Sequence, residues 1–444
     1  MIVTQAELNL IPVTTRIPYQ FGNQSLTEVT CARVKITAHN NDGTTSSGWG
    51  ETPLSVPWVW PSQLTFEERE RRLISFCQQI AHSFSESLTE GHPLVIGHRY
   101  QQEQLPKLLE QEKEKHPESE HMPHLAALVC LSAFDLALYD AFGQLHQVEA
   151  FEILNQKWLG KHDLATFLEP SDRFAGKYPA DYLSKRLDQL PVWHSIGGSD
   201  PLHESDLTGN EPNDNYPVLL RDWIRTDGLN CLKIKLRGND SDWDYQRLVT
   251  IGKIALDETV EWLTTDFNCT VSDPDYVNEI LDKLAREHPP IHNMILYVEQ
   301  PFPYDLEAHQ IDVHSVSARK PLFMDESAHD WKFVRMGLEL GWTGVALKTC
   351  KTLTGALLSL CWAKEHGMTL MVQDLTNPML AQIPHVLLAA HAGTIMGVES
   401  NAMQFYPDAS QKEAAVHPGL YHRKEGILDL STLKGPGFGY GEAV

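Results

Sequence analysis

The chain has 444 residues, which at about 150 residues per domain predicts two or three domains, although one α/β barrel alone takes roughly 250. Hydrophobic residues make up 42% and charged residues 21%, a composition typical of globular proteins that excludes disordered and fibrous architectures. The net charge of −23 repels phosphate backbones, anionic bilayers and, without local cations or a metal, small anionic substrates, so we expect neither a nucleic-acid nor a membrane partner.

The first 160 residues are predicted to form an α+β domain on an antiparallel sheet. Residues 1–12 alternate apolar and polar side chains, which favours a strand over a signal peptide. Residues 29–39 are rich in β-branched side chains and end at the hairpin sequence Asn40-Asn41-Asp42-Gly43. Two helices are expected next, over residues 65–88 and 124–155.

Two features bear on the compartment of the protein. The seven cysteines form no C-x-x-C pair and no zinc-like spacing with histidine, which favours a reducing compartment, the cytoplasm. Residues 125–142 are the most apolar long stretch, but they contain Asp135 and Asp140 at amphipathic spacing. This pattern predicts a buried helix and not a membrane span.

From about residue 190 the sequence repeats a short apolar run, a polar turn and a helical period. After the first run, the runs start roughly 20 to 35 residues apart, the spacing of βα units. Eight such units predict a (β/α) TIM barrel, whose strands are apolar because both of their faces are buried. A doubly wound sheet is the alternative, but it would carry a Gly-rich phosphate turn, and none is found. The runs are 191–196, 231–236, 262–266, 295–299, 322–325, 344–348, 369–373 and 394–398.

Two segments around the first run do not fit the repeat. Residues 160–190 precede it, and residues 197–215 form a long acidic loop directly after it. Loops that follow barrel strands lie at the face where active sites of such barrels are built. The loop is therefore either a solvated insertion or a lid over a site.

Ionisable residues fall at the carboxyl ends of successive runs. In a barrel these ends meet at one mouth, so three carboxylates from neighbouring strands are expected to lie side by side. Clustered carboxylates repel one another unless a cation binds them, and oxygen ligands without cysteine or histidine favour Mg²⁺, with Mn²⁺ as an alternative. The residues are Lys233, Lys235, Asp266, Glu299, Asp325 and Lys348.

The lysines suggest acid/base chemistry. Lys233 and Lys235 are two residues apart and point the same way, into the barrel, where mutual repulsion is expected to lower the pKa of at least one of them. Lys348 belongs to the sixth run and the pair to the second, so they lie opposite each other. Two bases flanking a metal-bound substrate suit the removal of a proton beside a carboxylate, where Mg²⁺ stabilises the enediolate.

Five motifs in order resemble the enolase superfamily, in the muconate-lactonizing branch of the mandelate racemase and muconate lactonizing enzymes. The resemblance covers nearly the whole chain and implies a capping domain over 1–160, a barrel over 161–420 and a segment over 421–444 that returns to the capping domain. The motifs are Lys233-Ile-Lys235, Asp266-Phe-Asn268, Glu299-Gln300-Pro301, Asp325-Glu326-Ser327 and Lys348-Thr-Cys-Lys351-Thr352.

This resemblance also implies roles for individual residues, a small carboxylate substrate and a homo-oligomer. Metal binding falls to Asp266, Glu299 and Asp325, with support from Asn268 and Glu326. Lys235 and Lys348 are the acid/base pair, and Lys233 binds the substrate carboxylate and tunes Lys235. Capping loops 17–26 and 52–63 close over the mouth, and the second contains Trp58 and Trp60, which either pack between domains or form an aromatic wall.

The chain also departs from the family pattern. Leu353-Thr354 replaces the usual paired glycines after Lys351-Thr352. Gln373 and Asp374 stand where the mandelate racemase branch carries a catalytic histidine, and Glu399 ends an eighth run that lacks the D-x-D of dipeptide epimerases. These three residues are candidates for substrate contact, and dipeptides are disfavoured as substrates.

Three functions remain open from the sequence. The first is Mg²⁺-dependent α-proton abstraction by a racemase, epimerase or cycloisomerase, followed by reprotonation. The second is a lyase of the o-succinylbenzoate-synthase or dehydratase type, which expels a β-leaving group after the same first step. The third is a non-catalytic metal-binding barrel, which is disfavoured because all three acids and both lysines are present.

Overall fold

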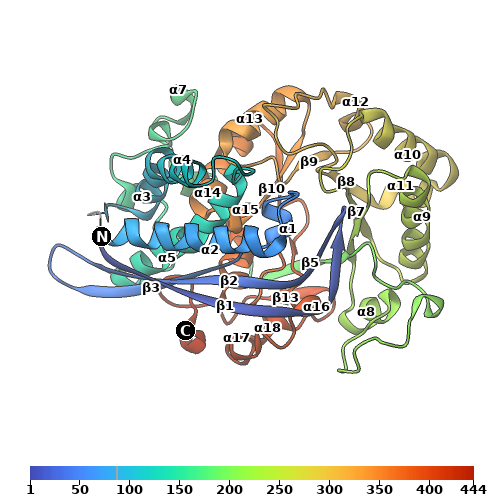
Figure 1. The fold of residues 1–444 in the computed structure, drawn as a ribbon, viewed down its shortest axis with the longest axis horizontal. Helices are drawn as coiled ribbons and strands as arrows, with labels where there is room; N and C mark the ends of the chain where they lie inside the picture. The colour runs from blue at the N-terminus through green and yellow to red at the C-terminus, as the bar shows by residue number, and fades with distance from the viewer. Residues whose placement is uncertain (87–88) are drawn as a thin grey trace.

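The structure is a computed structural model that describes residues 1–86 and 89–444. An antiparallel sheet with its helices lies beside a parallel barrel (Figure 1). The strands of the first part are β1 (Ile2–Phe21), β2 (Gln24–His39), β3 (Thr45–Pro53) and β4 (Thr89–Glu90). Its helices are α1 (Val56–Val59), α2 (Phe66–Glu86), α3 (Pro93–Arg99), η1 (Tyr100–Gln104), α4 (Leu105–Lys115) and α5 (His124–His146).

The sheet has the order β3-β2-β1-β4 and is antiparallel, as the sequence predicts. The expected hairpin joins β2 to β3, where the Asn40 amide donates to the Thr44 carbonyl over 2.9 Å and Gly43 takes a positive φ of 88°. Glycines in β3 let helix α5 approach the sheet closely, since a Cβ on Gly48 would lie 1.9 Å from the Ala141 nitrogen.

Both predicted helices of this part are present. The described part of the first ends at Glu86, and residues 87 and 88 of the predicted range lie outside the described residues. The prediction that the second helix extends to residue 155 is wrong. Helix α5 ends at His146 because Gln147 adopts a left-handed conformation, φ 54°, and the Val148 amide closes onto the Gly143 carbonyl.

The prediction of amphipathic spacing is wrong for helix α5, which is apolar on nearly all sides because nearly all of its residues are buried. Among the described residues it is the one helix long and apolar enough to cross a membrane, and its apolar window is fully buried inside the protein. It packs against β3 on one side, and Asp135 reaches the barrel, where its carboxylate accepts from the Thr354 amide (2.9 Å) and hydroxyl (2.7 Å). The predicted buried core helix is thus confirmed, and it also joins the two parts.

The second part is a nearly closed eight-stranded parallel barrel, which excludes the doubly wound sheet. The order is β11-β10-β9-β8-β7-β6-β5-β12, and across the remaining seam the Ile395 amide donates to the Leu370 carbonyl over 2.8 Å. A further strand, β13 (Ile427–Asp429), pairs antiparallel with β5. The barrel strands are β5 (Gln189–Ile196), β6 (Cys231–Lys235), β7 (Trp262–Asp266), β8 (Ile295–Glu299), β9 (Leu322–Met324), β10 (Gly344–Leu347), β11 (Thr369–Val372) and β12 (Val398–Glu399).

Helices surround the barrel, and several begin at an aspartate cap, as in α9, where the Asp240 carboxylate accepts from the Trp243 amide. The longer helices are α8 (Leu220–Asp227), α9 (Ser241–Asp257), α10 (Pro274–Glu287), α13 (Trp331–Leu340), α14 (Leu353–Glu365) and α15 (Gln382–Ala392). The shorter ones are α6 (Gln156–Leu159), α7 (Ser171–Phe174), α11 (Pro289–Met294), α12 (His314–Ser317), α16 (Ala402–Phe405), α17 (Gln411–Val416) and α18 (Pro418–Tyr421). Single 3₁₀ turns are η2 (Leu164–Thr166), η3 (Pro179–Asp181), η4 (Glu204–Asp206), η5 (Thr349–Lys351), η6 (Met379–Ala381) and η7 (Gly441–Ala443).

The inside of the barrel is layered. Five buried side chains form an apolar cluster at its centre: Trp193, Cys231, Tyr297, Phe323 and Met371. Because side chains alternate between faces, the residue two positions further along each strand points the same way. These residues are all polar: Ser195, Lys233, Glu299, Asp325 and Gln373. A charged layer therefore rests on an apolar floor at the carboxyl ends of the strands.

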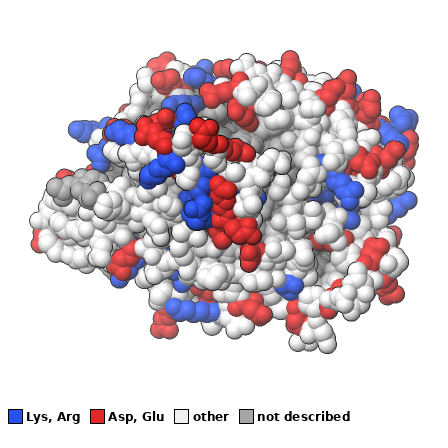
Figure 2. Space-filling view, viewed as in Figure 1, with Lys and Arg blue, Asp and Glu red and all other residues white. Residues whose placement is uncertain are grey.

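The last segment of the chain contacts both parts. Strand β13 pairs with β5, and beyond it the Gly437 amide donates to the Val148 carbonyl over 2.9 Å, beside the end of α5. The boundaries at residues 160 and 420 stay predictions. Acidic and basic side chains are interspersed over the face drawn in Figure 2, so the net charge of −23 is not gathered into one patch there.

Candidate active site

The three predicted carboxylates lie together at the mouth of the barrel. Asp266 and Glu299 end the neighbouring strands β7 and β8 and pair in register, and Asp325 follows β9 directly. Each is at most 1% exposed. Asp266 and Glu299 share a cation, because the Lys233 ammonium lies 2.6 Å from Glu299 and 3.1 Å from Asp266.

The predicted lysines project into the same buried layer. Lys235 forms an ion pair with Asp266 at 2.5 Å, so both residues of the pair point into the barrel, as expected. Across the mouth, the Lys348 ammonium lies 3.1 Å from Asp325 and donates to the Asp374 carbonyl over 2.6 Å. Lys233 has one further partner, Glu399, at 3.0 Å.

The expectation that repulsion lowers a lysine pKa is wrong for this pair. Burial acts to lower the pKa of Lys233, but the charges of Glu299, Glu399 and Asp266 raise it well above its usual value. For Lys235 burial is likewise outweighed, chiefly by Asp266, and its pKa is raised. In this arrangement attraction by the acids exceeds repulsion between the ammonium groups, so both lysines are cations.

The carboxylates respond to the same network in opposite directions. Burial and the neighbouring Asp266 raise the pKa of Glu299 well above its ordinary value. Burial acts in the same sense on Asp266, but Lys235 and Lys233 hold its pKa below the ordinary value. The mouth thus contains a mixed cluster of acids and ammonium groups and is not a purely negative site.

The donor set suits a hard divalent cation in kind and number. Three carboxylates converge from adjacent strands, and Asp325 Oδ1 is buried without a hydrogen-bond partner. As arranged, no three His, Cys, Asp or Glu side chains within 1–86 and 89–444 form a group that could hold a metal ion. In this arrangement ammonium groups contact the same oxygens: Lys233 contacts Glu299 and Asp266, Lys235 contacts Asp266, and Lys348 contacts Asp325. These residues fit Mg²⁺ if the lysines release them.

Glu326 and Asn268 lie beside this cluster. The backbone amide of Asn268 donates to Asp266 Oδ1 over 2.8 Å, and its side-chain Nδ2 donates to Glu326 Oε1 over 3.2 Å. Burial and the adjacent Asp325 raise the pKa of Glu326 to about 7. Trp58 also reaches Glu326, donating from Nε1 to Oε1 over 2.9 Å.

The two tryptophans of the second capping loop have different places. The ring centroid of Trp58 lies 5.3 Å from the Lys348 ammonium, so this side chain is part of the site. Trp60 is not: its Nε1 donates to Glu120 and its ring covers the Arg72 guanidinium at 4.5 Å. The prediction of an aromatic wall built from both residues is therefore wrong, because Trp60 packs within the N-terminal part.

The three candidates at the seventh and eighth strands differ in what they face. Gln373 donates to the Tyr297 hydroxyl over 2.9 Å and to Glu299, which orients that carboxylate. The Asp374 carboxylate accepts from the backbone amides of Asn377 (2.8 Å) and Asn401 (2.7 Å). Asp374 and Glu399 both line the inner cavity described next, whereas Gln373 does not.

Two cavities meet at the mouth. The inner cavity, of about 20 Å³, has room for roughly one water molecule. It is lined by Tyr19, Phe21, Leu26, Ser55, Trp58, Lys235, Asp325, Lys348, Asp374, Leu375, Thr376 and Glu399. Both predicted capping segments, 17–26 and 52–63, thus reach the site and close it. An outer cavity of about 260 Å³ adjoins, and Phe21 and Trp58 line both.

Three further residues of the site were not predicted from the sequence. The Tyr19 hydroxyl is 2.8 Å from Ser195 Oγ, and the Tyr19 ring lies 6.0 Å from the Lys235 ammonium. Lys351 donates to the Asp325 carbonyl over 2.5 Å, and Gln300 accepts from the Asp325 amide over 2.7 Å. The motifs contained Lys351 and Gln300, and Tyr19 lies within the predicted capping loop 17–26, although no local pattern singled it out there.

The acidic loop 197–215 is tied to this hairpin. Arg16 donates to Asp214 over 2.5 and 2.9 Å, and to the carbonyls of Tyr216 (3.0 Å) and Pro217 (3.2 Å). The Gly198 amide donates to the Gln20 carbonyl over 2.8 Å. The loop is exposed over much of its length, yet it is attached to the strand that carries Tyr19 and Phe21.

Arg16→Ala is expected to release this loop, because four hydrogen bonds from one guanidinium are lost together. Limited proteolysis, followed by mass spectrometry, should then show cleavage within residues 204–215 at least about fivefold faster than in the wild type. Arg71→Ala, on the exposed side of α2, serves as the control. Equal cleavage rates in all three proteins would mean that Arg16 does not hold the loop.

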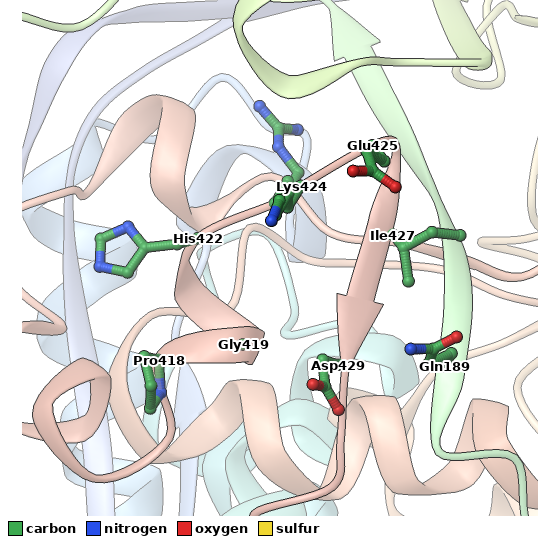
Figure 3. Close-up of a pocket in the computed structure, with 9 residues that line it drawn as sticks. Gln189, Pro418, Gly419, His422, Lys424, Glu425, Ile427 and Asp429 are labelled. Carbon is green, nitrogen blue, oxygen red and sulfur yellow. The ribbon is translucent and has the colours of Figure 1, made fainter.

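A separate surface pocket of about 670 Å³ lies at the other end of the barrel (Figure 3). Gln189, at the start of β5, and Asp429 of β13 line it, together with Lys424 and Glu425. None of the predicted site residues lines this pocket. Its place at the amino-terminal end of β5 separates it from the mouth, where sites of such barrels are built.

Comparisons with known proteins show the family and the fold. The family described as "Enolase C-terminal domain-like" matches residues 216–441. No curated protein sequence matches the chain. Three solved structures share the fold.

An N-succinyl Arg/Lys racemase from Bacillus cereus ATCC 14579 is 16% identical, with a TM-score of 0.63 over 99% of this chain and 95% of that one. A dipeptide epimerase from Enterococcus faecalis V583, complexed with Mg and L-Leu-L-Tyr, is 16% identical, with a TM-score of 0.63 over 99% of both chains. A 2-chloromuconate cycloisomerase from Rhodococcus opacus 1CP is 14% identical, with a TM-score of 0.62 over 98% of this chain and 96% of that one. The family match, which spans half of the chain, and the shared fold establish that this chain belongs to the enolase superfamily, among its mandelate racemase and muconate lactonizing enzyme-like members.

Proposed function

We propose that the protein is a Mg²⁺-dependent enzyme that removes the α-proton of a small carboxylate substrate and returns a proton, as a racemase, epimerase or cycloisomerase does. The observation that supports this most directly is the placement of two lysines on one small cavity. Lys235 ends β6 and Lys348 follows β10, four strands away in an eight-stranded barrel, and both line the inner cavity. A substrate carbon between them would present one face to each.

Lys235 and Lys348 are the proposed acid/base pair, each serving one face of the α-carbon. Lys233, which also contacts Glu399, is the proposed cation for the substrate carboxylate once Asp266 and Glu299 bind the metal. Tyr19, Phe21 and Trp58 exclude water from the cavity.

Asp266, Glu299 and Asp325 are the proposed metal ligands. A divalent ion held there would stabilise negative charge on the substrate carboxylate and weaken the attraction that keeps the lysine pKa values high. Both proton transfers still depend on a lysine. One lysine must be neutral to accept the α-proton, while the other donates a proton from the opposite face.

A lyase is the second candidate, because the acids beside the lysines favour a lysine that stays protonated. In a lyase one lysine removes the proton and the other remains a cation. Nearby acids suit either lysine to that second role, since Asp325 raises the pKa of Lys348 and Asp266 raises the pKa of Lys235 against the effect of burial. The two chemistries differ in whether both lysines exchange protons with solvent.

Solvent exchange tests the proposal. With Mg²⁺ and a panel of chiral carboxylates in D₂O, proton NMR should show loss of the α-proton signal for at least one substrate. In a racemase or epimerase both stereoisomers become labelled, whereas in a lyase a β-leaving group is lost. Absence of any α-exchange across N-acylamino acids, hydroxy acids and lactone acids such as muconolactone would refute the proposed function.

A further inference from the structure

The turn between β10 and α14 contains a strained residue. Thr352 has φ 79° and ψ 140°, a conformation that a β-branched side chain rarely adopts. It is fully buried and caps α14, where its Oγ1 accepts from the Gly355 amide over 3.0 Å. Backbone strain of this kind persists only where the surroundings over-determine the conformation, and it is concentrated at functional sites. The same turn begins with Lys348, one of the two proposed bases.

Asp135 of α5 holds the end of this turn. Its carboxylate is buried and accepts from the Thr354 amide over 2.9 Å and from the Thr354 hydroxyl over 2.7 Å. The Tyr139 hydroxyl lies 3.0 Å from the same Thr354 oxygen. Gly97 of α3 covers the pair closely, because a Cβ there would lie 2.3 Å from both Asp135 Oδ1 and Thr354 Oγ1. A buried polar network whose members are paired in this way is rigid.

Two further hydrogen bonds from the N-terminal part hold the same turn. Gln101, in the π-helical segment η1, donates from Nε2 to Thr352 Oγ1 over 3.0 Å, so it contacts the strained residue itself. Ser132 of α5 donates to the Thr349 carbonyl over 2.8 Å, directly after Lys348 in the chain. None of these residues of the N-terminal part lines the inner or the outer cavity. They therefore contact the turn from outside the site.

The other proposed base is held differently. Lys235 is the last residue of β6, and its backbone pairs in register with Asp266 of β7. Lys348 lies beyond the end of its own strand, since the pairing of β10 with β11 ends at Leu347 and Val372. The barrel itself therefore fixes the backbone of Lys235, whereas the backbone of Lys348 depends on the turn that follows it.

We propose that Asp135 and Gln101 are positioning residues for Lys348. By holding Thr354 and Thr352 they keep the turn in its strained conformation, and this conformation directs Lys348 into the inner cavity. The inference rests on the proposed function, in which Lys348 serves one face of the α-carbon. It adds that the N-terminal part supports one of the two proton transfers and not the other. A displacement of about 1 Å, caused far from the chemistry, can cost about 10²-fold in rate.

Exchange in D₂O separates positioning from general support of the fold. The enantiomer that Lys348→Met ceases to exchange is the one that Lys348 serves. Asp135→Ala should slow exchange of this enantiomer at least about tenfold and that of the other enantiomer less than about twofold. Asp135→Asn keeps an acceptor for the Thr354 amide and should stay within about threefold of the wild type for both. Equal losses for the two enantiomers in Asp135→Ala, or no loss, overturn the proposal.

A second variant covers the case in which Asp135→Ala does not fold. Gln101→Leu removes the donor to Thr352 and should slow the same enantiomer at least about fivefold, again with less than about twofold effect on the other. Gln104→Leu, at an exposed position of the same segment, is the matched control and should change neither rate. A Gln101→Leu protein that exchanges both enantiomers as Gln104→Leu does overturns the proposal.

Amide hydrogen exchange, followed by mass spectrometry, reports on the turn without turnover. In Asp135→Ala and in Gln101→Leu, peptides covering residues 349–356 should exchange at least about tenfold faster than in the wild type, and those covering 231–236 at the wild-type rate. Unchanged protection of residues 349–356 overturns the proposal. A turn that is released in the variants, in a protein whose wild type exchanges no α-proton, would count against the proposed function alone.

Discussion

Replacing Lys348 by methionine is expected to stop proton exchange at one face of the substrate carbon and to leave it at the other. Lys235 and Lys348 line the inner cavity from opposite strands, so each serves one stereoisomer. Loss of a positioned base costs about 10²–10⁴ in rate. In D₂O, Lys348→Met should therefore exchange one enantiomer at least about 10²-fold more slowly than the wild type, and Lys235→Met should show the reverse preference.

The control for this experiment is another buried lysine of the same layer. Lys351 contacts the Asp325 carbonyl but does not line the inner cavity. Lys351→Met should reduce exchange of both enantiomers to the same extent, if at all. Should Lys235→Met and Lys348→Met lose both enantiomers equally, each lysine would act through the network and not as the base for one face. If only one of the two variants, Lys235→Met or Lys348→Met, lost exchange, and the same one did so with every substrate, the result would favour the lyase.

Replacing Lys233 by methionine is expected to make folding stability depend on Mg²⁺. Its buried ammonium contacts Asp266, Glu299 and Glu399, so methionine leaves three buried carboxylates without their shared cation. Removing one partner from a buried ion pair costs about 3–5 kcal/mol. In EDTA, urea unfolding should show a loss of this size relative to the wild type. Mg²⁺ should restore most of it, because ligand binding to the native state stabilises by mass action.

Two comparisons make the Mg²⁺ result specific. Lys253→Met, on the exposed side of α9, should respond to Mg²⁺ as the wild type does. Combining Lys233→Met with Glu299→Gln removes one of the carboxylates and should recover part of the stability in EDTA. A Lys233→Met protein that is equally unstable with EDTA and with Mg²⁺ would show that Asp266, Glu299 and Asp325 do not bind the ion.

The sequence predicted the location of the charged layer well because it depends on two local rules. Strand ends can be read from apolar runs, and side chains alternate along a strand. Asp266, Glu299 and Lys235 therefore fall at the mouth of any barrel with these strands, whatever surrounds it. The buried helix α5 was predictable for a similar reason, although its end was not, since the left-handed Gln147 carries no strong local signal.

What the sequence did not reveal depends on partners that come from elsewhere in the chain. Two lysines in one strand predict repulsion, but Lys233 meets Glu299 from β8 and Glu399 from β12, and these contacts reverse the sign of the pKa shift. Two tryptophans in one loop look equivalent in the sequence. In the structure, however, Trp58 donates to Glu326, whereas the Trp60 ring packs against Arg72. Local spacing cannot express such differences.

The sequence by itself determined the fold class, the order of the barrel strands and the set of acids and lysines at its mouth, because strand periodicity places side chains without reference to the rest of the chain. Only the tertiary structure decided which of these groups are paired, how closed the site is and what lies beside it. Those properties follow from Coulomb attraction, burial and packing between distant segments: Tyr19 and Trp58 meet the barrel, and Glu326 meets the outer cavity, only once the chain has folded.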